Sequence, residues 1–336
     1  MSDATAGLPP DWQPSYRTCD DVSAICPVEA SVYGDYFTLG ACVFFLIAHF
    51  LLFVAQGYLA WRSRAWSFSI WLGIGTLFEV MGYGARIALS KNPWVYEAFV
   101  IQLLMLMLGP TLIAAAISIT FKHLVLWYGT QWSFLRPKLY PWVFVGSDWI
   151  SIVIQAAGGG VSATASSGGE AINPKLFDVG SGLLVAGVVF QLINMVFCGC
   201  LMLVYVWRRR QSIKKGLTPA SDTRPEDKKV KVFIYAISVA YIAIIIRCIY
   251  RIPEMQMGWG SELMQNETTF LVLDGAMILI AVLTLTIFHP YFYFPFISKK
   301  GDKKSKTDEV GGDVTSGNTT TTDVEESGAS ETKVVQ

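Results

Sequence analysis

The chain has 336 residues, of which 53% are hydrophobic and only 15% are charged, and its mean hydropathy is +0.44. So few charged residues cannot cover the water-facing surface of soluble domains of this size, which excludes an ordinary soluble protein. Its 26 Lys and Arg balance its 26 Asp and Glu, and the lack of a basic excess argues against a nucleic-acid partner. The composition predicts an all-α, polytopic membrane bundle instead of two globular domains.

Seven apolar runs along the chain have the length of a membrane-spanning helix, which needs about 20 mostly apolar residues. They are Tyr36–Ala60, Trp66–Leu89, Ala98–Thr120, Leu139–Ala157, Val179–Val206, Val230–Ile252 and Thr268–Phe292. We therefore expect a seven-helix domain over residues 36–292, preceded by an acidic segment over residues 1–35. Residues 293–336 are rich in Lys, Thr, Ser and Gly, a composition that predicts a disordered tail.

The basic residues predict the orientation of these spans, because Lys and Arg concentrate in cytoplasmic loops. One set of loops, with the tail, carries 19 basic residues, and the opposite set, with the N-terminal segment, carries three. Residues 207–229 alone carry eight. The N-terminus is expected outside and the C-terminus in the cytoplasm. No signal peptide is expected, because residues 1–35 lack a basic region followed by an apolar one.

Three residues on the expected outer side are candidates for covalent modification. Cys19 and Cys26 lie close enough in the sequence for a local disulfide in an oxidising compartment. Asn266 begins an Asn-Glu-Thr glycosylation sequon, although its position at the membrane surface disfavours its use.

Ionisable side chains inside the expected spans call for a functional or structural explanation, since each costs roughly 2.5–3.5 kcal/mol at mid-membrane. Those inside the spans or at their outer rim are Glu79, Arg86, Asp148, Arg247, Arg251, Glu254, Glu267 and Asp274. Most of them fall in the outer half of the membrane, with Glu79 and Asp148 the deepest. Two interpretations follow: a polar cavity open to the exterior or the outer leaflet, or a static network of ion pairs that holds the helices together.

Uncharged residues near this layer add to the candidate site. Gln155 lies two turns beyond Asp148, and Gln191 lies in the middle of the fifth span. Pro110 is expected to kink the third span and free a backbone carbonyl, which would suit gating. The glycines at positions 158–160 are expected to end the fourth helix in a flexible turn. Three scattered histidines give no metal site, and we expect no cofactor.

These residues form a pattern that resembles the fungal RTA-like proteins, a lipid-translocating exporter family named for resistance to aminocholesterol. The resemblance covers roughly residues 30–295. It rests on Glu79-x-x-Gly82-Tyr83-x-x-Arg86, Pro110 with Ala114-Ala115, Asp148 with Gln155 and the following glycines, Gln191, Arg247-x-x-Tyr250-Arg251-x-x-Glu254, Glu267, Asp274 and His289-Pro290.

The resemblance implies a multi-pass fungal protein, expected in the plasma membrane, that links lipid asymmetry to resistance against toxic amphiphiles and drugs. Sphingoid long-chain bases and sterol-like compounds are the implied substrates, and membrane lipids and amphiphilic small molecules the implied partners. The acids in the outer half would neutralise a cationic amine, while the arginines set their ionisation. Self-association and the cytoplasmic partners of residues 207–229 and of the tail stay open.

Three other functional classes compete with a transporter. A seven-helix receptor shares the expected topology, but Thr120-Phe121-Lys122-His123 stands where a receptor motif would close the third span. A membrane-embedded metal hydrolase lacks a histidine set at one depth. A regulator of other lipid translocases is not distinguished by sequence. The chain contains no Gly-x-x-x-x-Gly-Lys-[Ser/Thr] loop, so it is not an ATP-driven pump.

The expected topology is testable with epitope tags in intact and permeabilised cells. An N-terminal tag should bind antibody on intact cells, and a tag within residues 293–336 only after permeabilisation, because the basic loops hold that side in the cytoplasm. The opposite pattern of antibody access would contradict the orientation.

Overall fold

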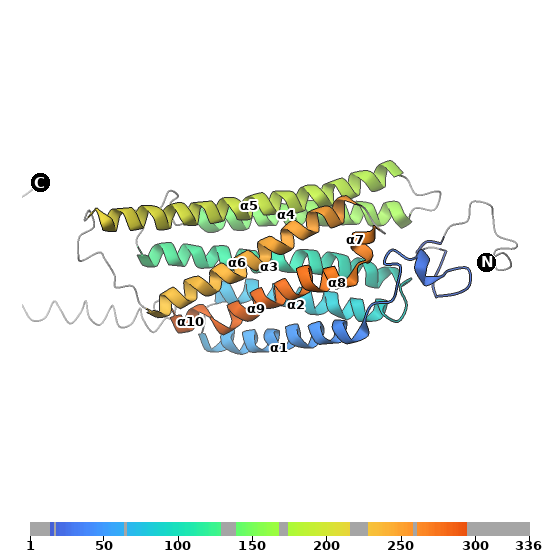
Figure 1. Ribbon diagram of the computed structural model, residues 1–336, viewed down its shortest axis with the longest axis horizontal. Coiled ribbons are helices and arrows are strands. Elements are labelled where there is room, and N and C mark those ends of the chain that lie inside the picture. Colours follow the sequence, from blue (N-terminus) through green and yellow to red (C-terminus); the bar gives the residue numbers. More distant parts are fainter. Residues whose placement is uncertain are drawn as a thin grey trace, which may run out of the picture.

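The protein is an elongated bundle of long helices that run along one axis (Figure 1). The structure is a computed structural model, and it describes residues 14–16, 18–63, 66–128, 139–167, 174–215, 228–257 and 261–293. The long helices are α1 (Leu39–Ser63), α2 (Trp66–Leu89), α3 (Tyr96–Tyr128), α4 (Leu139–Ser167), α5 (Pro174–Lys214), α6 (Lys228–Gln256) and α9 (Met277–Ile287). Short elements are η1 (Val28–Ala30), α7 (Glu262–Gln265), α8 (Glu267–Phe270), the π-helix η3 (Leu271–Ala276) and α10 (Pro290–Tyr293). These described segments contain no β-strand.

Each of the seven expected spans contains a helix, and α8, η3 and α9 follow one another without a break over Glu267–Ile287. Five of the described helical stretches are long and apolar enough to cross a membrane: α1, most of α3, most of α5, α6 and Glu267–Ile287. α2, with 24 residues, and α4, with 29, are not among these five stretches. That all seven cross the membrane stays a prediction, as does their orientation.

The glycines of α4 do not end the helix, as the sequence suggested, but let it pack closely against α5. α4 continues through them to Ser167. A Cβ added at Gly158 would lie 2.7 Å from the backbone nitrogen of Leu184 and 2.8 Å from the carbonyl oxygen of Gly180. The sequence expectation failed because glycine in a membrane helix serves close approach of two backbones as readily as a turn.

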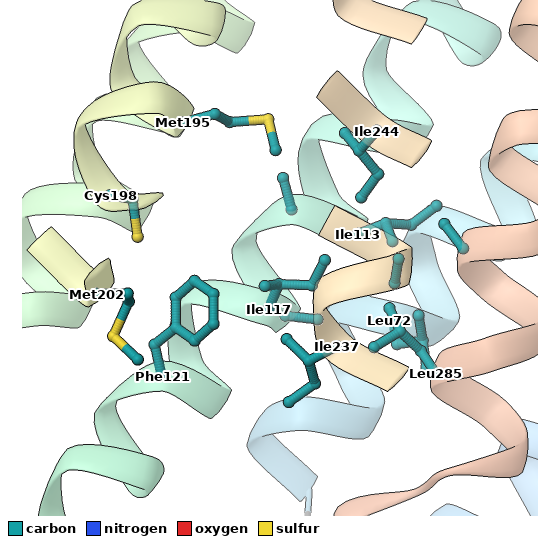
Figure 2. Packing of buried hydrophobic residues seen from close by; sticks show 14 of the residues in the cluster. Leu72, Ile113, Ile117, Phe121, Met195, Cys198, Met202, Ile237, Ile244 and Leu285 are labelled. Atoms are coloured by element: carbon teal, nitrogen blue, oxygen red, sulfur yellow. The ribbon is translucent and has the colours of Figure 1, made fainter. Parts of the chain in front are cut away.

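An apolar core fills the part of the bundle between α2, α3, α5, α6 and α9. In Figure 2, Ile113 and Ile117 of α3 lie beside Ile237 and Ile244 of α6. On α2, α6 and η3–α9, the buried charges lie beyond one end of most of these core residues. We call the end of the bundle that contains Arg86, Arg251 and Asp274 its polar half.

The outward surface of the long helices is apolar, as expected for a surface that faces lipid. Many of the most exposed large side chains lie on the long helices, and among them Leu203 is 71% exposed. Aromatic side chains are prominent at α-helix ends, with Trp61 exposed at the end of α1 and Trp142 near the start of α4, as in the interfacial belts of membrane proteins. The chain is an integral membrane protein.

The segment before α1 packs across one end of the bundle. A disulfide joins Cys19 to Cys26. The indole of Trp94, in the α2–α3 connection, donates to the carbonyl oxygen of Cys26 at 3.3 Å. The Asn92 amide donates at 2.7 Å both to the Asp20 carbonyl and to the Asp21 carboxylate. These contacts hold the disulfide-bonded loop against the connection between α2 and α3.

The close α4–α5 contact gives a stability prediction for Gly158→Ala. The added methyl group meets α5 backbone, which cannot rotate away, so we expect overpacking to lower the free energy of unfolding by about 1–3 kcal/mol. The measurement is the thermal unfolding midpoint in detergent. Gly160→Ala is the matched control, because an added Cβ there has nothing within 4 Å; equal midpoints for both variants would contradict the account.

Candidate functional site

Asp274 is the centre of the buried charges. It lies in the π-helix η3, is 1% exposed, and faces two arginines of α6. Arg251 donates from Nε to Oδ1 at 2.9 Å and from Nη2 to Oδ2 at 3.0 Å, a bidentate pair. Arg247 Nε lies 2.7 Å from Oδ1 as an ion pair without the alignment of a hydrogen bond. A π-helical turn often marks a functional position, and here it presents Asp274 to α6.

Pro110 supplies a further acceptor for Arg247. Proline has no backbone N–H, so the carbonyl of Leu106, four residues earlier, has no helical donor. Arg247 donates from Nη2 to that carbonyl. α3 runs through Pro110 to Tyr128. The proline therefore lets α3 bind Arg247 of α6. Whether it also serves gating stays a prediction.

Arg86 of α2 is buried between two aromatic rings. Its guanidinium carbon lies 3.7 Å from the ring centre of Phe37 and 4.1 Å from that of Phe270. Its Nη2 is 3.7 Å from Oε1 of Glu267, at the start of α8. Glu267 in turn accepts from the Thr38 backbone at 3.0 Å and from the Thr38 hydroxyl at 2.8 Å. Cation–π contacts and this ion pair join the segment before α1 to α2 and α8.

Glu254 completes the set, and a small cavity adjoins it. Arg251 Nη1 donates to Glu254 Oε2 at 2.9 Å. The cavity is lined by both of these residues, Arg86, Tyr33 and Gln102, among others, and has room for about one water-sized group. Gln102 donates to the Tyr33 hydroxyl at 2.9 Å. Burial raises the pKa of Tyr33 to about 12, so this hydroxyl stays neutral at physiological pH.

Glu79 is the exception among the acids around this cluster. Its carboxyl is 1% exposed, and Oε1 has no hydrogen-bond partner among the described residues. It packs against α3 at Gly109, where an added Cβ would lie 2.6 Å from Oε1. Asp274, Glu254 and Glu267 each have an arginine, but no ion pair to Glu79 is formed within the described part of the chain.

Asp148, Gln155 and Gln191 lie in a second polar cluster between α4 and α5. Asn194 donates to Asp148 Oδ1 at 2.7 Å. Gln155 donates to Gln191 at 3.2 Å, and Ser151 donates to the carbonyl of Gly187 at 2.7 Å. Across the described ranges, no ion pair or hydrogen bond joins this cluster to the arginines. The polar residues expected in a single layer thus form two clusters on different sets of helices.

The structure also places the remaining sequence candidate and shows which contacts the sequence did not predict. Asn266 is exposed, and its side chain caps α8 by accepting from the Thr269 backbone at 3.1 Å. No group of three potential metal ligands occurs in the described part of the chain.

Sequence reasoning missed the two rings around Arg86 and the Thr38 donors. The free Leu106 carbonyl could have been located, because it lies four residues before Pro110.

The sequence matches a known family over residues 72–296, which is described as RTA1 like protein. The match covers more than half of the chain. The chain belongs to the RTA1-like family. The matched range contains every buried charge of the candidate site.

Three similar curated proteins come from Saccharomyces cerevisiae. The chain is 30% identical over 257 residues to the sphingoid long-chain base transporter RSB1 of Saccharomyces cerevisiae strain S288c, covering 69% of this chain and 66% of the relative. It is 28% identical over 217 residues to Protein RTM1, covering 64% and 65%. It is 27% identical over 215 residues to protoporphyrin uptake protein 1, covering 63% and 65%. The alignments thus span just under two thirds of these relatives. No solved structure matches the chain.

Breaking the central pair gives a stability prediction for Asp274→Asn. The substitution leaves Arg247 and Arg251 buried beside a neutral amide, so we expect a loss of about 3–5 kcal/mol in the free energy of unfolding. Thermal or denaturant unfolding in detergent measures it. Asp178→Asn, on the exposed start of α5, is the control and should unfold like wild type. An unchanged midpoint for Asp274→Asn would contradict the central role of this pair.

Proposed function

We propose that this RTA1-like protein translocates cationic amphiphilic lipids across the plasma membrane, with sphingoid long-chain bases as the substrate class. The observation that carries the proposal is a pair of buried carboxyl groups, Glu79 and Asp148, that have no basic partner among the described residues. They lie inside an apolar helical bundle whose relatives include a protein named as a sphingoid long-chain base transporter. Resistance to toxic amphiphiles, including drugs, would follow from such export.

Charge pairing limits which acids can receive an amine. Asp274 and Glu254 are held by Arg251, and Glu267 by Arg86, so a substrate amine would have to displace a guanidinium group. Glu79 and Asp148 need no such displacement. An amine brought beside either one would form an ion pair where water is excluded, and such a pair is stronger than one at the surface.

The alkyl chain of the substrate would lie against the apolar outer faces of the helices. Large apolar side chains such as Leu203 and Ile193, both of α5, are exposed there. A lipid can therefore keep its tail in the bilayer while its headgroup enters between helices. Movement of the headgroup between helices while the tail stays in the bilayer suits a transporter without an ATP-binding loop. Such movement requires no enzymatic reaction.

The test is transport of a fluorescent sphingoid base by liposomes that contain only this protein. We expect flux above that of protein-free liposomes, and about tenfold lower flux for Glu79→Gln or Asp148→Asn, since losing roughly 1.4 kcal/mol of interaction is a tenfold effect. Glu97→Gln, at an exposed position in the first turn of α3, is the matched control.

Two results would contradict the proposal. Flux equal to that of protein-free liposomes would favour a regulator of other translocases over a transporter. Wild-type flux in both carboxyl variants, with normal folding, would show that these two acids do not bind the amine.

A further inference from the structure

The acids around Asp274 outnumber the arginines by one. Arg86, Arg247 and Arg251 face Glu254, Glu267 and Asp274, and every one of these six side chains has an oppositely charged partner within 4 Å. This set is neutral. Glu79 is a fourth acid beside it, and as a carboxylate it would add one uncompensated negative charge in a site from which water is excluded. An isolated buried carboxylate costs far more than a neutral carboxyl.

The groups that face Glu79 do not supply the missing charge. Arg247 and Arg251 of α6 are engaged by Asp274, Glu254 and the Leu106 carbonyl. Asp274 of η3 carries the same charge as Glu79. On its own helix, Tyr83 follows one turn later and its hydroxyl has no partner among the described residues.

The remaining neighbouring elements form no ion pair with Glu79 within the described residues. The His49 ring of α1 stacks on Tyr83 at 5.6 Å, and its Nδ1 lies 2.8 Å from the Phe45 carbonyl oxygen. α3 faces the Glu79 carboxyl at Gly109, where the missing side chain leaves space for it.

We propose that Glu79 exchanges a proton for the cationic headgroup of the lipid. In the arrangement described here Glu79 is a neutral carboxyl. When a cationic headgroup enters, the O–H bond breaks, the proton leaves to water, and the carboxylate forms an ion pair with the headgroup. When the lipid leaves, Glu79 takes up a proton again. Each cycle thus moves one proton opposite to one lipid cation, and the charge of the site is the same in both states.

This inference rests on the proposed function and assigns its energy source. Exchange at one carboxyl makes lipid movement depend on the proton gradient, which a scramblase would not do. Asp148 is not the exchanging group in this account, because its Oδ1 already accepts a hydrogen bond from Asn194. Glu79 Oε1 has no such donor among the described residues.

The experiment uses liposomes with a trapped pH-sensitive dye and a clamped membrane potential. The probe is an N,N,N-trimethyl sphingoid base, whose permanent charge prevents it from crossing as a neutral amine. Inward movement of the probe should drive protons outward at about one per molecule. A gradient of one pH unit should shift the final distribution of the probe about tenfold, because one pH unit corresponds to about 1.4 kcal/mol.

A binding measurement assigns the proton to Glu79. In weakly buffered detergent, the probe should release about one proton per wild-type protein. Glu79→Asp, which keeps a carboxyl, should also release a proton, Glu79→Gln none, and Glu97→Gln as many as wild type. The thermal unfolding midpoint of each variant is measured first and must equal that of wild type.

The outcomes separate the two proposals. Probe movement without proton movement, or proton release that persists in Glu79→Gln, overturns the exchange and leaves the transport function standing. No probe movement at all in wild-type liposomes overturns the proposed function, and the exchange with it.

Discussion

The bidentate pair between Arg251 and Asp274 is the contact on which the polar half of the bundle depends. An ionised side chain in a membrane interior is costly, and its cost falls only when an opposite charge and further hydrogen bonds accompany it. Asp274 therefore fixes η3 against α6, and Arg247 extends the connection to α3 through the carbonyl that Pro110 leaves free. The contacts of Arg86 with Phe37, Phe270 and Glu267 then bring the segment before α1 over the same end.

Sequence alone predicted much of this fold because membrane helices leave a strong signal. Every expected span contains a helix, and the start of α2 and its end at Leu89 agree with the prediction. The charged residues were identifiable because few ionisable side chains occur in apolar runs. The pairing was not predictable, since the bidentate contact of Arg251 depends on the π-helical turn that orients Asp274. The glycines of α4 show the same limit, because their role depends on the distance to α5.

The separation of the polar residues into two clusters changes how the site is understood. A shared depth along the membrane suggested one layer, but depth says nothing about which helices are neighbours. Asp148 lies in the cluster between α4 and α5, where Asn194 donates to it and Gln155 donates to Gln191. Glu79 lies beside the charged cluster without being paired in it. A carboxyl that is buried, unpaired and adjacent to a neutral set of ion pairs is free to change its charge when a cation arrives. That property is the one that the proposed movement of cationic lipids would use.

The protonation state of Glu79 tests this account most directly, and infrared spectroscopy of the purified protein measures it. The difference spectrum between wild type and Glu79→Gln at neutral pH should contain the C=O stretch of one protonated carboxyl. That band should disappear from wild type when a permanently charged cationic amphiphile is added. A difference spectrum that shows an ionised carboxylate before any amphiphile is present would contradict the account.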